Sequence, residues 1–132
     1  MSLTLEDARR IISAAEQRAV EIGQPMNVAV VDGGGNLVAH VRQDGAWIGS
    51  IDISISKAWT SRAFDISTGD LGANSQPGQQ FFGIHTANGG RVAIFAGGVP
   101  LTRDGQVVGA VGVSGGSGEQ DQTVADAGAA AF

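Results

Sequence analysis

The chain contains no cysteine and no tyrosine. Without cysteine it has no disulfide bond, no thiol nucleophile and no zinc–thiolate site. Basic residues are also scarce: 8 lysines and arginines stand against 13 aspartates and glutamates, giving a formal net charge of -5. Because the basic residues are scattered singly, we expect neither nucleic acid nor an anionic membrane as a partner.

Long apolar segments are missing as well. No run of the sequence approaches the roughly 20 apolar residues needed to cross a bilayer. No basic segment followed by an apolar one, the pattern of a secretory signal, is visible at the start. We therefore predict a cytoplasmic protein. Its length fits one domain, residues 1–132, which buries enough surface to fold without a disulfide or a metal.

Glycine, by contrast, is abundant, with 21 of 132 residues. The stretch GGVPLTRDGQVVGAVGVSGGSGEQD, residues 97–121, raises two alternatives: a phosphate-binding loop, or a hairpin followed by a helix start. Its spacing matches neither G-x-x-x-x-G-K-[ST] nor G-x-G-x-x-G within a strand–helix–strand unit. Asp104-Gly105 is a strong hairpin signal. We therefore favour the hairpin.

The residues after this hairpin favour a helix start over an anion site. Ser117 and Gln120 match a capping box, which satisfies the free N–H groups of the first turn internally. Glu119 and Asp121 would repel a phosphate and complement the helix dipole without any ligand. We expect Asp32, which precedes three glycines, to bond backbone N–H groups of the turn, and Asp121 to do the same at the last helix.

Hydrophobic periodicity predicts the remaining elements. We expect helices at residues 4–22, 48–64 and 119–131, and strands at 27–32, 37–42, 91–96, 99–103 and 106–113. Residues 48–64 also alternate like a strand, but the length of the segment favours a helix. Residues 65–90 read as a long irregular loop, a kind of segment that is often functional. Hairpin-connected strands predict an antiparallel sheet covered by helices, in the α/β (α+β) class.

Several motifs together resemble the GlcG/HbpS-like family of haem-binding or haem-degrading proteins, a module that also forms the C-terminal part of PduO-type proteins. They are D-x-G-G-x-L-V-A from residue 32, R-x-D-G-A from 42, K-A-x-T from 57, G-G-V-P from 97, G-A-V-G-V-S-G from 109 and Q-D at 120. The resemblance implies a profilin-like fold with a five-stranded antiparallel sheet flanked by helices. It also implies a homo-oligomer, often an octamer, and haem bound near subunit interfaces.

Histidine is the usual axial ligand of haem, and the chain has only His40 and His85. In haem-binding relatives a histidine of the N-terminal region is implicated, whereas residues 4–22 contain none. His85 follows Phe81 and Phe82, and this mixture of apolar walls and one polar group suits a ligand pocket. The alternative is an exposed loop histidine beside an aromatic anchor. We expect His40 to point away from Leu37, toward a surface or an interface, where together with Arg42 it could flank a ligand pocket.

Arg42 and Lys57 belong to the family motifs and leave two alternatives open. As a cationic pair they would hold the carboxylates of haem or of a small organic acid. Otherwise they form internal salt bridges to Asp44 or Asp52. The sequence shows no hydrolytic triad and no cluster with metal-ligand spacing.

Three functions remain open from the sequence. The first is a small-molecule-binding protein with haem or another tetrapyrrole as ligand, using His85, Phe81 and Phe82. The second is a cofactor-independent lyase or isomerase acting on a small organic acid, with Arg42 and Lys57 binding the carboxylate. The third is a structural or regulatory homo-oligomer whose exposed aromatic residues lie in subunit contacts.

Overall fold

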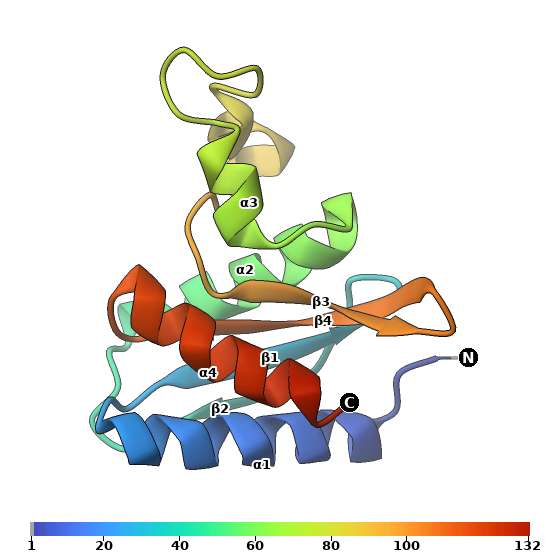
Figure 1. The fold of residues 1–132 in the computed structure, drawn as a ribbon, viewed down its shortest axis with the longest axis vertical. Helices are drawn as coiled ribbons and strands as arrows, with labels where there is room; N and C mark the ends of the chain where they lie inside the picture. The colour runs from blue at the N-terminus through green and yellow to red at the C-terminus, as the bar shows by residue number, and fades with distance from the viewer. Residues whose placement is uncertain (1) are drawn as a thin grey trace.

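An antiparallel sheet lies between helices in the computed structural model, which describes residues 2–132 (Figure 1). The helices are α1 (Leu5–Ile22), α2 (Gly49–Phe64), α3 (Thr68–Ala73) and α4 (Gly118–Ala130), with 3₁₀ turns η1 (Ile84–Thr86) and η2 (Asn88–Gly90). The strands are β1 (Asn27–Asp32), β2 (Leu37–Arg42), β3 (Gly98–Arg103) and β4 (Gln106–Ser114). The predicted helices and the two predicted hairpins are therefore confirmed, including the helical assignment of residues 48–64.

The sheet has 4 strands in the order β2-β1-β4-β3, all antiparallel. The prediction of five strands was wrong, because residues 91–96 form no strand. The backbone of this segment bonds to a helix side chain instead: the N–H of Ala93 donates to Thr60 Oγ1 at 3.0 Å. Val92 and Ala93 are buried, so their apolar pattern reflects docking onto helices.

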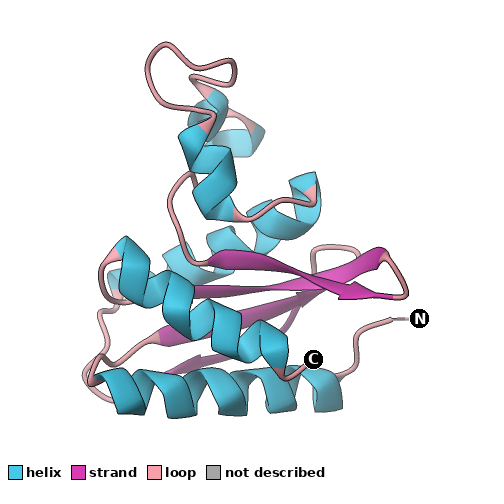
Figure 2. Ribbon diagram, in the orientation of Figure 1, coloured by secondary structure: helices cyan, strands magenta, loops and turns pink. Residues whose placement is uncertain are grey.

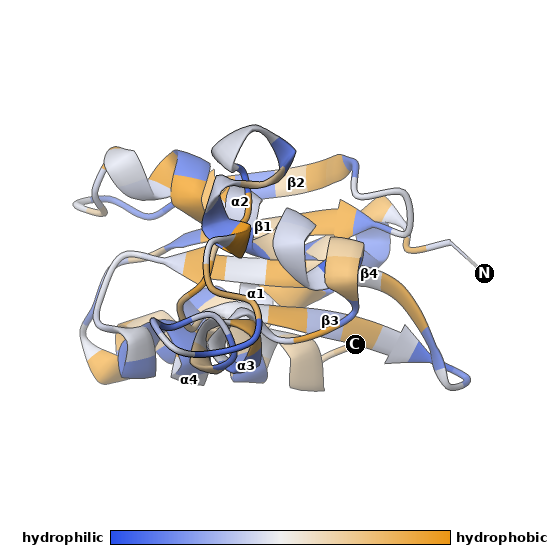
Figure 3. Cartoon of the chain, turned by 90° about the horizontal axis from the view of Figure 1, so that it is seen from above, coloured by the Kyte–Doolittle hydropathy of each residue, from blue (hydrophilic) through white to orange (hydrophobic). Residues whose placement is uncertain are grey.

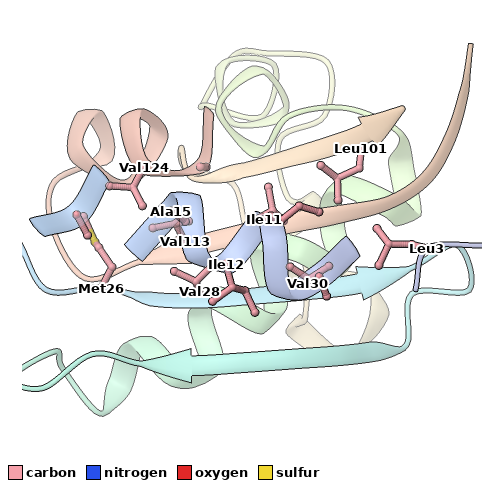
Figure 4. Close-up of a cluster of buried hydrophobic side chains, with 14 residues drawn as sticks. Leu3, Ile11, Ile12, Ala15, Met26, Val28, Val30, Leu101, Val113 and Val124 are labelled. Carbon is pink, nitrogen blue, oxygen red and sulfur yellow. The ribbon is translucent and has the colours of Figure 1, made fainter. Parts of the chain in front are cut away.

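Helices α1 and α4 cover one face of the sheet and α2 covers the other (Figures 1 and 2). Between α1, α4 and the sheet lies the larger core cluster, which includes Ile11, Ile12, Val28, Val113 and Val124 (Figure 4). Apolar residues run along much of the central strands β1 and β4 (Figure 3), as expected for a sheet that helices cover on both faces. Helix α1 begins with a capping box, in which the N–H of Asp7 donates to Thr4 Oγ1 at 3.1 Å.

The layer between α2 and the sheet is made of small residues. A Cβ on Gly112 of β4 would collide with the carbonyl oxygen of Ser54 and with the backbone N of Ala58. Helix α2 therefore lies directly on β4 at Gly112 and leaves no space for a side chain there. Its buried face is mainly polar, with Ser54, Lys57 and Ser61 enclosed.

Residues 68–97, between the end of α2 and β3, project from one side of the sheet (Figure 1). We call this segment the arm. The sequence predicted an irregular loop over most of it, whereas the structure contains α3, η1 and η2 there. Both candidate ligand surfaces described below use residues of the arm.

Candidate functional site

The aromatic part of the arm lies on its surface. Phe81 and Phe82 are 44% and 61% exposed, and His85 is exposed in η1. The rings of Phe82 and His85 meet edge to face, with centroids 6.3 Å apart. Gly83, at φ 97, turns the chain between them, a conformation that favours glycine. The structure thus brings Phe82 and His85 together, as the sequence suggested.

The main recesses of the described chain lie elsewhere. The recesses at Arg42, Arg91, Arg18 and Arg62, all within residues 2–132, are not lined by Phe81, Phe82 or His85. The arm is closed by local turns, such as the hydrogen bond from the N–H of Phe81 to the oxygen of Asn74 at 2.9 Å. These turns present the aromatic side chains outward. Any enclosed site at this position needs a second surface.

Lys57 is enclosed between α2, β4 and α4. Its side chain is 0% exposed, and Nζ lies 2.8 Å from Asp121 Oδ2, whose own side chain is 3% exposed. Nζ also donates to the carbonyl of Val113 at 2.9 Å and lies 4.6 Å from the centre of the Phe95 ring. The internal salt bridge expected for Lys57 exists, but its partner is Asp121, and the prediction of Asp44 or Asp52 was wrong.

Burial dominates the electrostatics of this pair. Desolvation lowers the pKa of Lys57, and the hydrogen bond and attraction from Asp121 offset it only in part. Desolvation likewise raises the pKa of Asp121, although the hydrogen bond and attraction from Lys57 act in the opposite direction. Asp121 Oδ1 in addition accepts from the N–H of Gly116 at 2.9 Å, which confirms its predicted role at the start of α4. The pair is therefore a structural element that excludes Lys57 from ligand contact.

Arg42 does not join Lys57 in a cationic pair, so that alternative was wrong. The Arg42 side chain donates to the carbonyl of Ala46 at 3.3 Å. It lines a recess of about 560 Å³ between α1 and the end of β2, together with Glu16 and Asp44. Charges of both signs line this recess, whereas Lys57 is not among its residues.

His40 lies on β2 opposite Ala29, a residue that packs under α2. Ala39 and Val41 pack against the core on the other face, so the predicted orientation of His40 is confirmed. The ring is half-buried, and its Nε2 finds no hydrogen-bond partner among residues 2–132. Desolvation lowers the pKa of His40. Burial thus favours the neutral form of the His40 ring, and no hydrogen bond within residues 2–132 holds its Nε2.

One further recess, of about 370 Å³, was missed by sequence reasoning. It lies between α2 and the returning end of the arm, and its lining includes Asp52, Trp59 and Arg91. The Arg91 guanidinium carbon stands 3.6 Å from the centre of the Trp59 ring. The sequence offered one weak signal, an arginine directly after Asn-Gly-Gly in a long loop.

Other predicted structural roles are confirmed. Asp32 Oδ1 accepts from the N–H groups of Gly34 at 2.9 Å and Asn36 at 3.0 Å. Ser117 and Gln120 form the capping box of α4.

Across the described chain, no three His, Asp or Glu side chains are grouped to hold a metal ion. No helix of residues 2–132 is both long and apolar enough to span a bilayer.

Comparison with known proteins identifies similar chains along the whole length. A family model described as "Haem degrading protein HbpS-like" matches residues 3–130. The corrinoid adenosyltransferase PduO of Citrobacter freundii is 35% identical over 132 residues, which cover 100% of this chain and 39% of PduO.

Two solved structures are close to this fold. The crystal structure of Klebsiella pneumoniae protein ORFY has a TM-score of 0.97 and 40% identity, covering 100% of this chain and 91% of that one. The crystal structure of a PduOC–haem complex has a TM-score of 0.95 and 35% identity, covering 100% of this chain and 96% of that one.

Proposed function

We propose a function from one premise: the chain belongs to the HbpS-like family of haem-degrading proteins, whose model matches residues 3–130. The family resemblance predicted from the motifs is thereby confirmed. The proposed function is binding of haem or a related tetrapyrrole between subunits of a homo-oligomer. The observation that carries it is the exposed cluster of Phe81, Phe82 and His85 on the arm.

The side chains of this cluster suit one of the two faces of a haem. An axial ligand requires an imidazole nitrogen that is free of other bonds; His85 is exposed, and no hydrogen bond occupies its ring among residues 2–132. Phe81 and Phe82 supply an apolar wall beside it. When bound, haem would supply an iron centre, and His85 would hold that iron. The related PduOC was crystallised as a haem complex, which supports this choice of ligand.

A second subunit is needed to close the site. A haem exposes two apolar faces, and one arm covers only one of them. Large apolar side chains are exposed elsewhere too, including Trp47 at 62% and Ile48 at 75%, and surfaces of this kind commonly mark interfaces. We therefore propose a homo-oligomer, with the octamer and a cytoplasmic location as the specific expectations. If light scattering gives a mass of 13.3 kDa, that of a single chain, the proposed site between subunits is excluded.

Haemin titration tests the proposal. Adding haemin to the folded protein should shift the Soret band, and His85→Ala should abolish the shift. His40→Ala is the matched control: it removes the chain's other histidine and should leave the shift in place. A spectrum identical to free haemin at stoichiometric protein overturns the proposed function. Loss of the shift in His40→Ala alone, with an unchanged circular dichroism spectrum, overturns the assignment of His85.

The two other functions have less support. The lyase or isomerase alternative loses its carboxylate-binding pair, since Lys57 is enclosed and bonded to Asp121. A structural or regulatory oligomer remains the outcome if the protein assembles but haemin leaves its spectrum unchanged.

A further inference from the structure

The recess between α2 and the arm has the features of a small-ligand site that is separate from the Phe81–His85 cluster. Its volume of about 370 Å³ lies at the lower end of the roughly 300–1,000 Å³ usual for ligand pockets. It is lined by Gly35, Asp52, Ile55, Ser56, Trp59, Gly89, Gly90 and Arg91. Three separate segments thus converge on it: the β1–β2 turn, helix α2 and the end of the arm.

Trp59 is the fixed wall of this recess. Its ring packs edge to face against Phe64, with centroids 6.4 Å apart. The β1–β2 turn also comes so close that a Cβ on Gly35 would lie 3.1 Å from Trp59 Cδ1. Gly35 also has φ +77, a conformation that favours glycine. The ring is therefore held in place before any ligand arrives.

Arg91 supplies a positive charge with no protein partner. Its guanidinium stacks on Trp59, but none of the ion pairs among residues 2–132 includes it. Most other arginines have such a partner: Arg10 and Arg103 pair with Asp7, and Arg62 pairs with Asp65. A stacked guanidinium with free N–H groups is suited to bidentate binding of a carboxylate.

Asp52 supplies the opposite charge in the same recess. It is exposed on the first turn of α2 and forms no ion pair with Arg91, because no such contact within 4.0 Å exists among the described residues. The recess therefore presents one unpaired positive group and one unpaired negative group. A ligand with both charges would neutralise both, whereas a simple anion would leave Asp52 to repel it.

We propose that this recess binds a small zwitterion of the α-amino acid type. The ligand carboxylate pairs with Arg91, the ammonium group faces Asp52, and the aliphatic part lies on Trp59 and Ile55. The open recess and the single charge pair imply weak binding, with a dissociation constant on the order of millimolar. This inference is independent of haem binding.

Nuclear magnetic resonance of the indole N–H groups tests the proposal on the folded chain. The protein has two tryptophans, so Trp47→Phe assigns the Trp59 signal. The probes are L-alanine, propionate, which lacks the ammonium group, and ethylamine, which lacks the carboxylate. L-alanine should shift the Trp59 signal saturably, and propionate and ethylamine should bind several-fold more weakly.

Three variants locate the two charges. Arg91→Gln should weaken L-alanine binding roughly tenfold, the loss expected for one charge-assisted pair. Asp52→Asn should abolish the preference for L-alanine over propionate. Arg9→Gln removes an exposed arginine of α1 that does not line the recess and should change nothing.

Specific results overturn the proposal. The absence of a saturable shift with roughly 100 mM L-alanine excludes the site, and so does unchanged binding in Arg91→Gln. Equal affinities for L-alanine and propionate in the unmodified protein exclude the zwitterion.

Discussion

Replacing Lys57 with methionine gives the sharpest test of how the interior is held together. The substitution keeps the length of the side chain but removes an ammonium group that is 0% exposed and 2.8 Å from Asp121 Oδ2. It leaves the Asp121 carboxylate buried with backbone donors only. Removing one partner of a buried ion pair costs about 3–5 kcal/mol in the free energy of unfolding. For a domain of this size the melting temperature should fall by roughly 4 °C per kcal/mol.

The pH dependence of the free energy of unfolding in alkaline solution reports on Lys57 in particular. Lys57 is the only lysine, and the chain has no tyrosine or cysteine, so hardly any other side chain titrates between about pH 9 and 11. Desolvation lowers the pKa of Lys57 in the folded state below its ordinary 10.5, so in that window the unfolded chain binds more protons. The free energy of unfolding should therefore rise with pH, with a slope of up to about 1.4 kcal/mol per pH unit.

Urea unfolding, followed by circular dichroism from pH 8 to pH 11, measures both effects. Lys57→Met should lower the free energy of unfolding and abolish the alkaline slope. The double variant Lys57→Met with Asp121→Asn should lose less free energy of unfolding than the two single variants lose together, because it removes both buried charges. A free energy that falls with pH in the unmodified protein would refute the reasoning, since attraction to Asp121 would then outweigh desolvation. Arg18→Met, which breaks the exposed pair with Glu21, is the control and should change stability by less than about 0.5 kcal/mol.

Further predictions concern acid stability and the small-residue layer. Hydrogen bonds from the Thr4 backbone N–H and from Arg10 lower the pKa of Asp7 from 3.8 to about 2, so this carboxylate stabilises the fold above pH 3.8 and the contribution disappears as the pH falls toward 2. Asp7→Asn should therefore cost about 1–2 kcal/mol at pH 7 and much less near pH 2 in urea unfolding. Gly112→Ala should cost about 3 kcal/mol or more, because its Cβ meets the backbone of α2. Gly49→Ala, in the first turn of the same helix with nothing within 4 Å of its Cβ, should be neutral or slightly stabilising in thermal unfolding.

Local rules made much of the fold predictable. The Asp104-Gly105 hairpin forms with φ 53 and φ 77 at its two central residues, the positive values that such a turn requires. The capping boxes at Thr4 and Ser117 form as their three-residue spacing indicates. Each of these features depends only on residues a few positions apart, so one sequence is enough to identify them.

Features that depend on distant residues were beyond the sequence. Residues 91–96 have the composition of a strand, yet their position against α2, more than 30 residues earlier in the chain, decides their conformation. Lys57 and Asp121 are 64 positions apart, whereas the aspartates considered for Lys57 were near it in sequence. The same limit applies to the recess at Arg91, which combines residues from three segments.

The close contact between α2 and the sheet explains why both candidate sites involve the arm. Gly112 leaves no space between helix and strand, and Lys57 in that layer is already bonded to Asp121 and Val113. The layer between α2 and β4 therefore offers no ligand site, and both proposed sites use residues of the arm. The arm leaves the end of α2 and returns to β3, and it carries His85 on its outer surface and Arg91 against the side of α2. The tight interior thus leaves both proposed sites to a peripheral segment on which His85 and Arg91 are exposed.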